Sequence, residues 1–392
     1  MDGLETIVNS LEVYCRDRSW AGFDPYDALN SELFARTPLA RSRAARLVLT
    51  QFLKRSPVDV RPLLRIRPHQ NPKALGLFLS SYSERARSGD EAAPRHARQV
   101  ASRLLQLRAP DESCWCWGYS FPWQMRTRLV PKFSPNLVCT VFAATRLLDA
   151  YESGLGQEFL APASSAGEYV ARSLYWSDGR AAGFAYPLPD IRVPIHNANF
   201  LGAALLCRLA RCTGERGAVD VAARVARYSA AVQRDDGSWP YGVGTTQQWV
   251  DNFHTGFNLC ALRSIGADLQ TSEFDAGIRK GYWFYREHFF TPRGEPKYFQ
   301  DRTYPLDIHS VAQSLITLYA FRRLDPEAEG LADSVLAWAM RHMWDERGFF
   351  YYRVLRGLTI RTSYMRWSQA WMFRALQGLA QAGSAAYAEG RR

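Results

Sequence analysis

The 392-residue sequence lacks the segments that a membrane span or an export signal requires. Its longest apolar runs, such as residues 200–207, are less than half as long as a bilayer-crossing helix. The chain begins MDGLETIVNS, without the basic and apolar regions of a signal peptide. We therefore expect a cytoplasmic protein with no transmembrane segment, for which peripheral membrane contact stays open.

Motifs for nucleotide binding and for esterase chemistry are also missing, because the sequence has no Walker loop, no G-x-G-x-x-G after a strand and no G-x-S-x-G. The seven cysteines form no C-x-x-C pair, which favours reduced thiols over disulfides or a metal site. The net charge of +11 comes from arginines scattered over outer helical faces, away from the aromatic segments. Nucleic acid is therefore not an expected partner.

Apolar residues make up 47% of the chain and aromatic residues 13%, enough for a large core. The sequence also repeats itself. Five aromatic segments each precede an apolar helix that opens with a polar group. These helices begin near residues 136, 196, 254, 309 and 367, and a sixth candidate begins near residue 71. A nearly constant period of about sixty residues indicates a repeat architecture.

A second set of helices alternates with these and has a more polar outer face, over residues 39–53, 93–107, 164–174, 219–232, 274–288 and 328–343. Six hairpins with buried inner helices and amphipathic outer helices are typical of a closed toroid. We therefore predict an all-α (α/α)6 toroid over residues 39–392, with inner helices starting near residues 71, 136, 196, 252, 307 and 366. Residues 1–38 are interpreted as an N-terminal extension packed on the barrel. Strand-like patches such as 349–354 are expected to form short hairpins in the loops.

Each aromatic loop leads into the N-terminal end of an inner helix, so these loops should surround one mouth of the toroid. A ligand is expected there. Flat rings at a mouth suit stacking on a sugar or stabilising a cation, although core packing is the better explanation of any single ring. The aromatic candidates for substrate binding are Trp117, Tyr119, Trp123, Trp239, Tyr241, Tyr298 and Tyr364.

Three histidines recur at this level in consecutive repeats, as His196, His254 and His309. The positive end of a helix disfavours imidazolium, so each ring is suited to act as a neutral general base. Asp251 and Asp307 precede two of them and are expected to act as helix N-caps, as catalytic groups or as both. We predict these five residues as the catalytic set, with buried structural histidines as the alternative. His254 and His309 should reach one ligand.

Amides and cations at the same level favour an acidic sugar. Asn136, Asn197 and Gln369 are suited to bind hydroxyls, and Lys297 and Arg366 are suited to neutralise an acid group. The sixty-residue spacing of the three histidines follows from the repeat period and does not imply converging ligands. We expect no metal ion and no cofactor.

Residues 233–239 (QRDDGSW) fit the Q-x-x-x-G-x-W pattern and resemble the repeat of the squalene-cyclase and prenyltransferase family of α/α toroids, although that family's D-x-D-D motif has no counterpart here. A wider resemblance, over about 115–379, is to toroid proteins encoded in bacterial exopolysaccharide biosynthesis loci. It is carried by strings such as CWGYSFPWQ, IHNANFLGAALL, WVDNFHTGFNL, DIHSVAQ and YMRWSQAWMFRAL. This resemblance implies a cytoplasmic role in making or modifying a surface polysaccharide.

Three functions follow as hypotheses. The first is a carbohydrate-active enzyme that moves protons at an acidic sugar, as a lyase or epimerase, or that hydrolyses it with Asp251 and Asp307 as an acid–base pair. The second is a non-catalytic polysaccharide-binding or assembly component. The third is a terpenoid or prenyl-lipid enzyme, with a polyprenyl-linked sugar as a further possible ligand. Substrate identity and oligomeric state stay open at this point.

Overall fold

The inner ring of helices defines the architecture of the computed structural model, which describes residues 2–110 and 112–389. Each inner helix packs on the next, and the last packs on the first, so the ring closes. The inner helices are α4 (Pro72–Arg87), α6 (Leu137–Glu152), α8 (His196–Thr213), α10 (Asn252–Leu269), α12 (Ile308–Phe321) and α14 (Ala370–Glu389). The predicted (α/α)6 toroid is confirmed.

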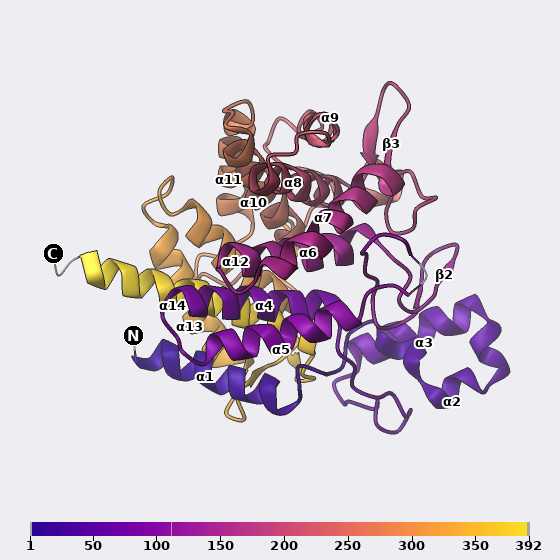
Figure 1. The fold of residues 1–392 in the computed structure, drawn as a ribbon. Coiled ribbons are helices and arrows are strands. Elements are labelled where there is room, and N and C mark those ends of the chain that lie inside the picture. Colours follow the sequence, from indigo (N-terminus) through magenta and orange to yellow (C-terminus); the bar gives the residue numbers. More distant parts are fainter. Residues whose placement is uncertain (1, 111, 390–392) are drawn as a thin grey trace.

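An outer layer of helices covers this ring. Five of them each pack against the inner helix that precedes them in the chain: α5 (Ala93–Gln106), α7 (Leu160–Glu168), α9 (Val219–Ala230), α11 (Asp275–His288) and α13 (Ala328–Met343). The sixth outer position is filled by α1 (Asp2–Asp17), which packs against α14, so helices from the two ends of the chain lie together (Figure 1).

The helix expected in the outer ring over residues 39–53 forms as α3 (Arg43–Arg55) but lies elsewhere. It packs on the short helices η1 (Asp27–Asn30) and η2 (Pro38–Arg41), and with α2 (Glu32–Ala35) it projects from the body of the protein (Figure 1). The prediction that this helix covers the inner ring was wrong, because an amphipathic pattern identifies a helix but not the surface that it covers.

Polar caps fix where the inner helices begin. The side chains of Asn71, Asn136, Asp251 and Asp307 each accept a hydrogen bond from a backbone N–H in the first turn of α4, α6, α10 and α12. These caps satisfy donors that a helix start leaves free. The starts agree with the predicted ones, and α14 is preceded by a π-helical turn, η6 (Met365–Gln369).

Strands are short and lie in the connecting loops, as expected. Within the described residues, four small antiparallel sheets form: β1 (Trp123–Gln124) with β2 (Leu129–Val130), β3 (Tyr175–Ser177) with β4 (Ala182–Phe184), β6 (Trp344–Asp345) with β7 (Phe349–Phe350), and β8 (Arg353–Leu355) with β5 (Leu306–Asp307) and β9 (Leu358–Ile360). They order the loops that lead into the inner helices.

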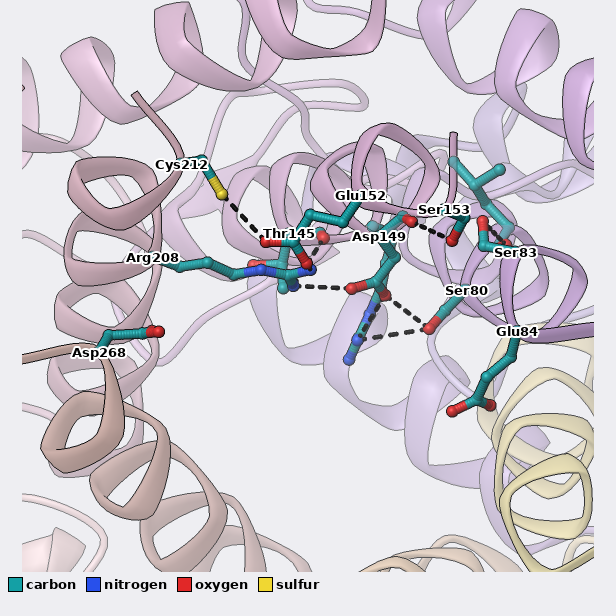
Figure 2. Close-up of polar contacts among 12 residues, drawn as sticks. Ser80, Ser83, Glu84, Thr145, Asp149, Glu152, Ser153, Arg208, Cys212 and Asp268 are labelled. Atoms are coloured by element: carbon teal, nitrogen blue, oxygen red, sulfur yellow. Dashed lines mark hydrogen bonds and ion pairs between the residues drawn. The ribbon is translucent and has the colours of Figure 1, made fainter. Parts of the chain in front are cut away.

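Ion pairs connect the inner helices at the end where those helices finish (Figure 2). Asp149 of α6 accepts from Ser80 of α4 at 2.6 Å and pairs with Arg208 of α8 at 2.7 Å. Arg208 also reaches Glu152 at 2.6 Å. Burial by itself would raise the pKa of Asp149, but Arg146 and Arg208 outweigh it and hold that pKa below its ordinary value. The network stays charged and crosslinks three helices.

The segment between α1 and α4 crosses to the opposite end of the ring. Its residues 22 and 23 form isolated bridges to His69 and Tyr364, and Met365 donates its backbone N–H to the Phe23 carbonyl. A buried ion pair between Arg61 and Asp27, with atoms 2.8 Å apart, holds the segment together around a small core of its own. The segment therefore contacts the start of η6, where the last inner helix begins.

Among the described residues, no helix combines the length and the apolar character of a membrane span. All seven cysteines are free thiols, and Cys15, Cys116, Cys139 and Cys207 are buried.

Candidate functional site

Asp251 and His254 form a pair at the start of α10. One carboxylate oxygen of Asp251 accepts the backbone N–H of His254 at 2.8 Å, and the other lies 2.7 Å from His254 Nδ1. Asp251 is buried, whereas the His254 side chain keeps 20% of its exposure. Because a carboxylate accepts, Nδ1 carries the proton, and Nε2 is left as a basic nitrogen. The pair therefore presents an oriented general base.

A small, tightly packed hollow surrounds this base. Tyr241 stacks on Trp249 with ring centroids 4.3 Å apart, and both rings lie within 6 Å of the His254 ring. The side-chain oxygens of Asn197 and Asn258 are buried and have no hydrogen-bond partner among the described residues. The lining residues are Asn197, Trp239, Pro240, Tyr241, Trp249, Asp251, His254, Thr255 and Asn258. Aromatic faces beside free amide oxygens suit a ring that carries hydroxyls.

His309 occupies an aromatic cage and is almost fully buried, at 1% exposure. Its ring centroid lies 4.6 Å from those of Phe253 and Trp367 and 4.7 Å from that of Trp371. Both ring nitrogens have no partner in the described part of the chain. Burial first, and then the charge of Lys73, keep the pKa of His309 well below its ordinary value. The ring is therefore neutral.

Asp307 does not orient the His309 ring, in contrast to Asp251. One of its oxygens caps His309 through the backbone N–H and accepts from Trp367 Nε1 at 2.8 Å. The other oxygen pairs with the Arg353 guanidinium, with the nearer nitrogen 2.5 Å away. Asp307 is fully buried and engaged on both oxygens.

Lys73 is a buried cation at the start of α4. Its ammonium lies 4.1 Å from the ring centroid of Phe142, 5.2 Å from that of Trp371 and 5.5 Å from that of Phe257. Within residues 2–110 and 112–389, no ion pair or hydrogen bond to this ammonium is found. Burial lowers the pKa of Lys73 to about 7, with a smaller effect from Arg366. A desolvated ammonium without a counter-ion is suited to receive an anion.

The structure brings His254 and His309 together. The Phe253 ring lies between them, 4.2 Å from the first and 4.6 Å from the second, and the Phe257 ring lies 6.0 Å from each. Both residues thus share one aromatic surface at the mouth.

His196 is separated from these two histidines. Its Nδ1 lies 3.2 Å from Ser229 Oγ on α9, so the ring faces the outer layer, and burial lowers the pKa of His196 to about 4. Helical phase contributes to this separation, because, counted from the start of each helix, His196 lies two steps from His254 and one step from His309. His196 is the first residue of its helix, whereas His309 is the second and His254 the third, and each step turns a side chain by about 100°.

The two cations predicted to bind an acid group, Arg366 and Lys297, already interact with other groups of the protein. Arg366 forms a bidentate ion pair with Asp24, at 2.5 and 2.8 Å, and lies over the Tyr119 ring. Lys297 donates to the Gln300 carbonyl at 2.7 Å. The expectation that these side chains neutralise a ligand acid is therefore not met by Arg366, because Asp24 supplies its counter-charge. Lys73, in contrast, is a buried cation without a counter-ion among the described residues.

Several predicted binding residues hold the loops in place. The indole Nε1 of Trp117 donates to the Leu104 carbonyl on α5, and that of Trp239 donates to the Ser229 carbonyl on α9. Asn136 caps α6, and Gln369 forms hydrogen bonds with the backbone of Phe350. Trp123 of β1 pairs with Val130 of β2. The Tyr364 ring packs on Tyr352 and Arg61. Of these side chains, Trp239 also lines the hollow.

Tyrosine hydroxyls from separate loops gather at the mouth. Burial first raises the pKa of Tyr241, and Tyr186, Asp251 and Tyr26 raise it further. Burial likewise raises the pKa of Tyr298, followed by Asp251 and Tyr26. These phenols therefore stay protonated and are available as hydrogen-bond donors.

Sequence reasoning did not identify Lys73, Trp249, Asp24 and Tyr26. A signal existed for Lys73, because it is the second residue of α4 just as His309 is the second residue of α12. Asp24 and Tyr26 come from a segment outside the repeats, so the repeat alignment contains no information on them. The described residues contain no group of three His, Cys, Asp or Glu side chains arranged to hold a metal ion.

Comparison with known proteins gives structural matches only. No family model and no curated protein sequence matches the chain. Cellobiose 2-epimerase from Bacillus thermoamylovorans superposes with a TM-score of 0.65 at 11% identity, over 81% of this chain and 90% of that chain. The GH76 α-mannanase from Bacteroides thetaiotaomicron gives 0.61 at 12% identity, over 80% and 87%. An unsaturated glucuronyl hydrolase specific for heparin gives 0.59 at 11% identity, over 81% and 89%. These likenesses show a shared toroid fold.

Proposed function

We propose that the protein is a carbohydrate-active enzyme that moves a proton at an acidic sugar. The observation that carries this proposal is the Asp251–His254 pair, in which a buried carboxylate orients a partly exposed imidazole. This arrangement is suited to general base catalysis. The stacked rings of Tyr241 and Trp249 beside it support a sugar as the ligand.

In the proposed reaction, His254 Nε2 removes the proton on the carbon next to the sugar's carbonyl or carboxylate group. The electron pair of that C–H bond moves onto the carbonyl oxygen and forms an enolate. Lys73 supports this step, because an unpaired ammonium stabilises a negative charge that develops in a dry site. Protonation of the opposite face by a tyrosine phenol such as that of Tyr298 gives an epimer, and His254 and the phenol are then restored by proton exchange with solvent. Loss of a substituent from the next carbon gives instead the unsaturated product of a lyase.

Hydrolysis is less well supported. A hydrolase needs one carboxyl group to protonate the leaving oxygen and a second carboxylate to act as base or nucleophile. Asp251 and Asp307 are 1% and 0% exposed, and their oxygens are engaged by His254, by Arg353 and by Trp367.

The neighbours support a carbohydrate substrate, since their names include sugar epimerases, a mannanase and a glucuronyl hydrolase. The resemblance to exopolysaccharide-locus proteins supports a surface polysaccharide, or its polyprenyl-linked precursor, as the material acted on in the cytoplasm. A non-catalytic binding component fits the stacked rings and free amides but leaves the Asp251–His254 pair without a role.

Deuterium exchange tests the proposal. The protein is incubated in heavy water with glucuronate, galacturonate and uronate oligomers, and proton NMR follows the loss of C–H signals. We expect exchange or elimination with an acidic sugar, and a decrease of about 10²- to 10⁴-fold in His254→Gln. His342→Gln is the matched control, because His342 is an exposed histidine on α13. Binding of these sugars with neither exchange nor elimination would identify a binding component instead.

A further inference from the structure

Residues 32–67 form a strongly basic segment, called here the basic apolar surface. It contains nine of the 49 Lys and Arg residues and two of the 38 Asp and Glu residues. Nine minus two gives +7, so this segment carries most of the net charge of +11. Both acids are already paired, Glu32 with Arg67 and Asp59 with Arg61. A compact stretch of chain therefore presents an excess of positive charge.

Large apolar side chains are exposed on the same segment. Val48, Val58 and Leu63 are 68%, 66% and 75% exposed. Six of the 14 exposed large apolar residues in the described chain fall within these 36 positions: Leu33, Leu39, Val48, Phe52, Val58 and Leu63. Exposed apolar side chains that gather in this way, with polar groups around them, mark an interaction surface.

Helix α3 is apolar on two faces. Thr50 and Leu53 are buried toward the protein, while Val48 and Phe52 point outward. The outward face is a shallow apolar groove lined by Leu47, Val48, Gln51, Phe52, Arg55, Ser56 and Pro57. The buried face of α3 therefore packs against the protein, and the exposed face is available to a partner.

Four arginines around these apolar side chains are uncompensated. Arg36, Arg41, Arg43 and Arg65 are exposed, and none forms an ion pair within the described chain. Their charge is therefore available to an anionic partner. Repulsion between two such positively charged surfaces opposes a second copy of this chain as that partner.

We propose that the basic apolar surface docks on an anionic lipid bilayer. Arginines would neutralise lipid phosphates while Val48, Phe52, Val58 and Leu63 enter the boundary between headgroups and acyl chains. Nucleic acid would satisfy the arginines but offers nothing to exposed aliphatic side chains. In Figure 1, α2 and α3 project freely from the helical body, as a surface element that meets a membrane must.

Docking would also bring the bilayer close to the mouth of the toroid. Asp24 and Tyr26 precede the surface in the chain and contact Arg366 and Trp367 at the start of the last inner helix. The bilayer would therefore lie close to the end of the toroid that contains the Asp251–His254 pair. This inference does not depend on the proposed reaction, because binding to vesicles is measured without substrate.

Vesicle sedimentation tests the inference with the full chain. Vesicles of phosphatidylcholine alone are compared with vesicles that also contain phosphatidylglycerol, at low and at high salt. We expect binding to the anionic vesicles, weakened at high salt because screening reduces the attraction. The double variants Val48→Asp/Phe52→Asp and Arg41→Glu/Arg43→Glu should each bind at least about tenfold more weakly. Leu358→Asp, which changes an exposed apolar residue on β9 outside this surface, should bind as the unchanged protein does.

Each other outcome overturns the inference. Absence of pelleting with anionic vesicles would do so, and so would equal binding to both vesicle types. Binding of polyglutamate or of polyuridylate in preference to vesicles would identify an acidic protein or a nucleic acid as the partner. Light scattering that finds a dimer, disrupted by Phe52→Asp without any vesicle binding, would identify a second copy. Circular dichroism verifies that each variant is folded.

Discussion

The two ends of the inner ring differ in how their buried polar side chains are satisfied. Where the inner helices begin, His309, Asn197 and Asn258 leave buried polar atoms without a partner in the described part of the chain, and Lys73 has no counter-ion there. Where the helices end, carboxylates and guanidinium groups pair with each other, as Figure 2 shows for Asp149 and Arg208. Unpaired buried groups cost stability, so those around His254 and His309 support the proposed ligand site at this end.

The helices themselves explain part of this difference. A helix C-terminus carries partial negative charge and favours arginine, and Arg208 and Arg211 both lie in the C-terminal half of α8. A helix N-terminus carries partial positive charge and favours a neutral histidine beside a carboxylate cap. This difference between the two ends is incomplete. At the end where the helices finish, called here the paired end, Arg146 Nε and Asp268 Oδ2 have no partner among the described residues.

The largest effect is expected when the two capping carboxylates of the mouth are compared. Asp251→Asn should reduce turnover by about 10²- to 10⁴-fold, because an amide no longer fixes the proton on His254 Nδ1. Asp307→Asn should instead destabilise the fold by about 3 to 5 kcal/mol, because Arg353 loses its buried partner. Steady-state kinetics and denaturant unfolding measure the two effects. Equal losses of turnover per folded molecule in the two variants would contradict the different roles given to Asp251 and Asp307.

At the paired end, Asp149→Asn should lower the free energy of unfolding by about 3 kcal/mol, because Arg146 and Arg208 lose a shared carboxylate. The lowered pKa of Asp149 gives the sign of the pH dependence. Its contribution is present above the ordinary pKa near 4 and is lost as the pH falls toward the lowered value in the folded state. Urea titrations at several pH values follow this. A decrease in turnover without loss of stability would contradict the assignment.

Lys73→Met should have a smaller and opposite effect on stability. Removing a desolvated ammonium that lacks a counter-ion should raise the free energy of unfolding, more at pH 6 than at pH 9, because the lowered pKa of about 7 means that the ammonium is charged at the lower pH. Affinity for uronate should fall about 10-fold, as for loss of one charged partner. Calorimetry measures the change in affinity for glucuronate, with glucose as the uncharged control, separately from the change in stability. Unchanged uronate affinity would show that Lys73 receives no anion.

His196 gives the smallest expected effect. Its pKa is lowered to about 4, so the unfolded chain binds a proton that the folded chain does not, and stability falls as the pH drops below 6.5. The slope from this group is about 1.4 kcal/mol per pH unit. His196→Gln should remove that part of the slope and leave turnover unchanged. A large loss of turnover with normal stability would place His196 in the catalytic set after all.

The sequence predicted the ring well, since periodic apolar patterns and polar caps are local properties. It predicted the site less well, for two physical reasons. A shift of one residue relative to a helix start turns a side chain by about 100°, which separates His196 from His309 although their loops align. Asp24, Tyr26 and α3 belong to a segment without repeats, whose partners follow from tertiary packing alone.

A crystal soaked with glucuronate tests the central claim most directly. The account predicts density for the sugar at the mouth, with the ring on Tyr241 or Trp249, a C–H group toward His254 Nε2 and the carboxylate toward Lys73. Density at the paired end near Asp149, or a sugar at the mouth that contacts neither His254 nor Lys73, would contradict it.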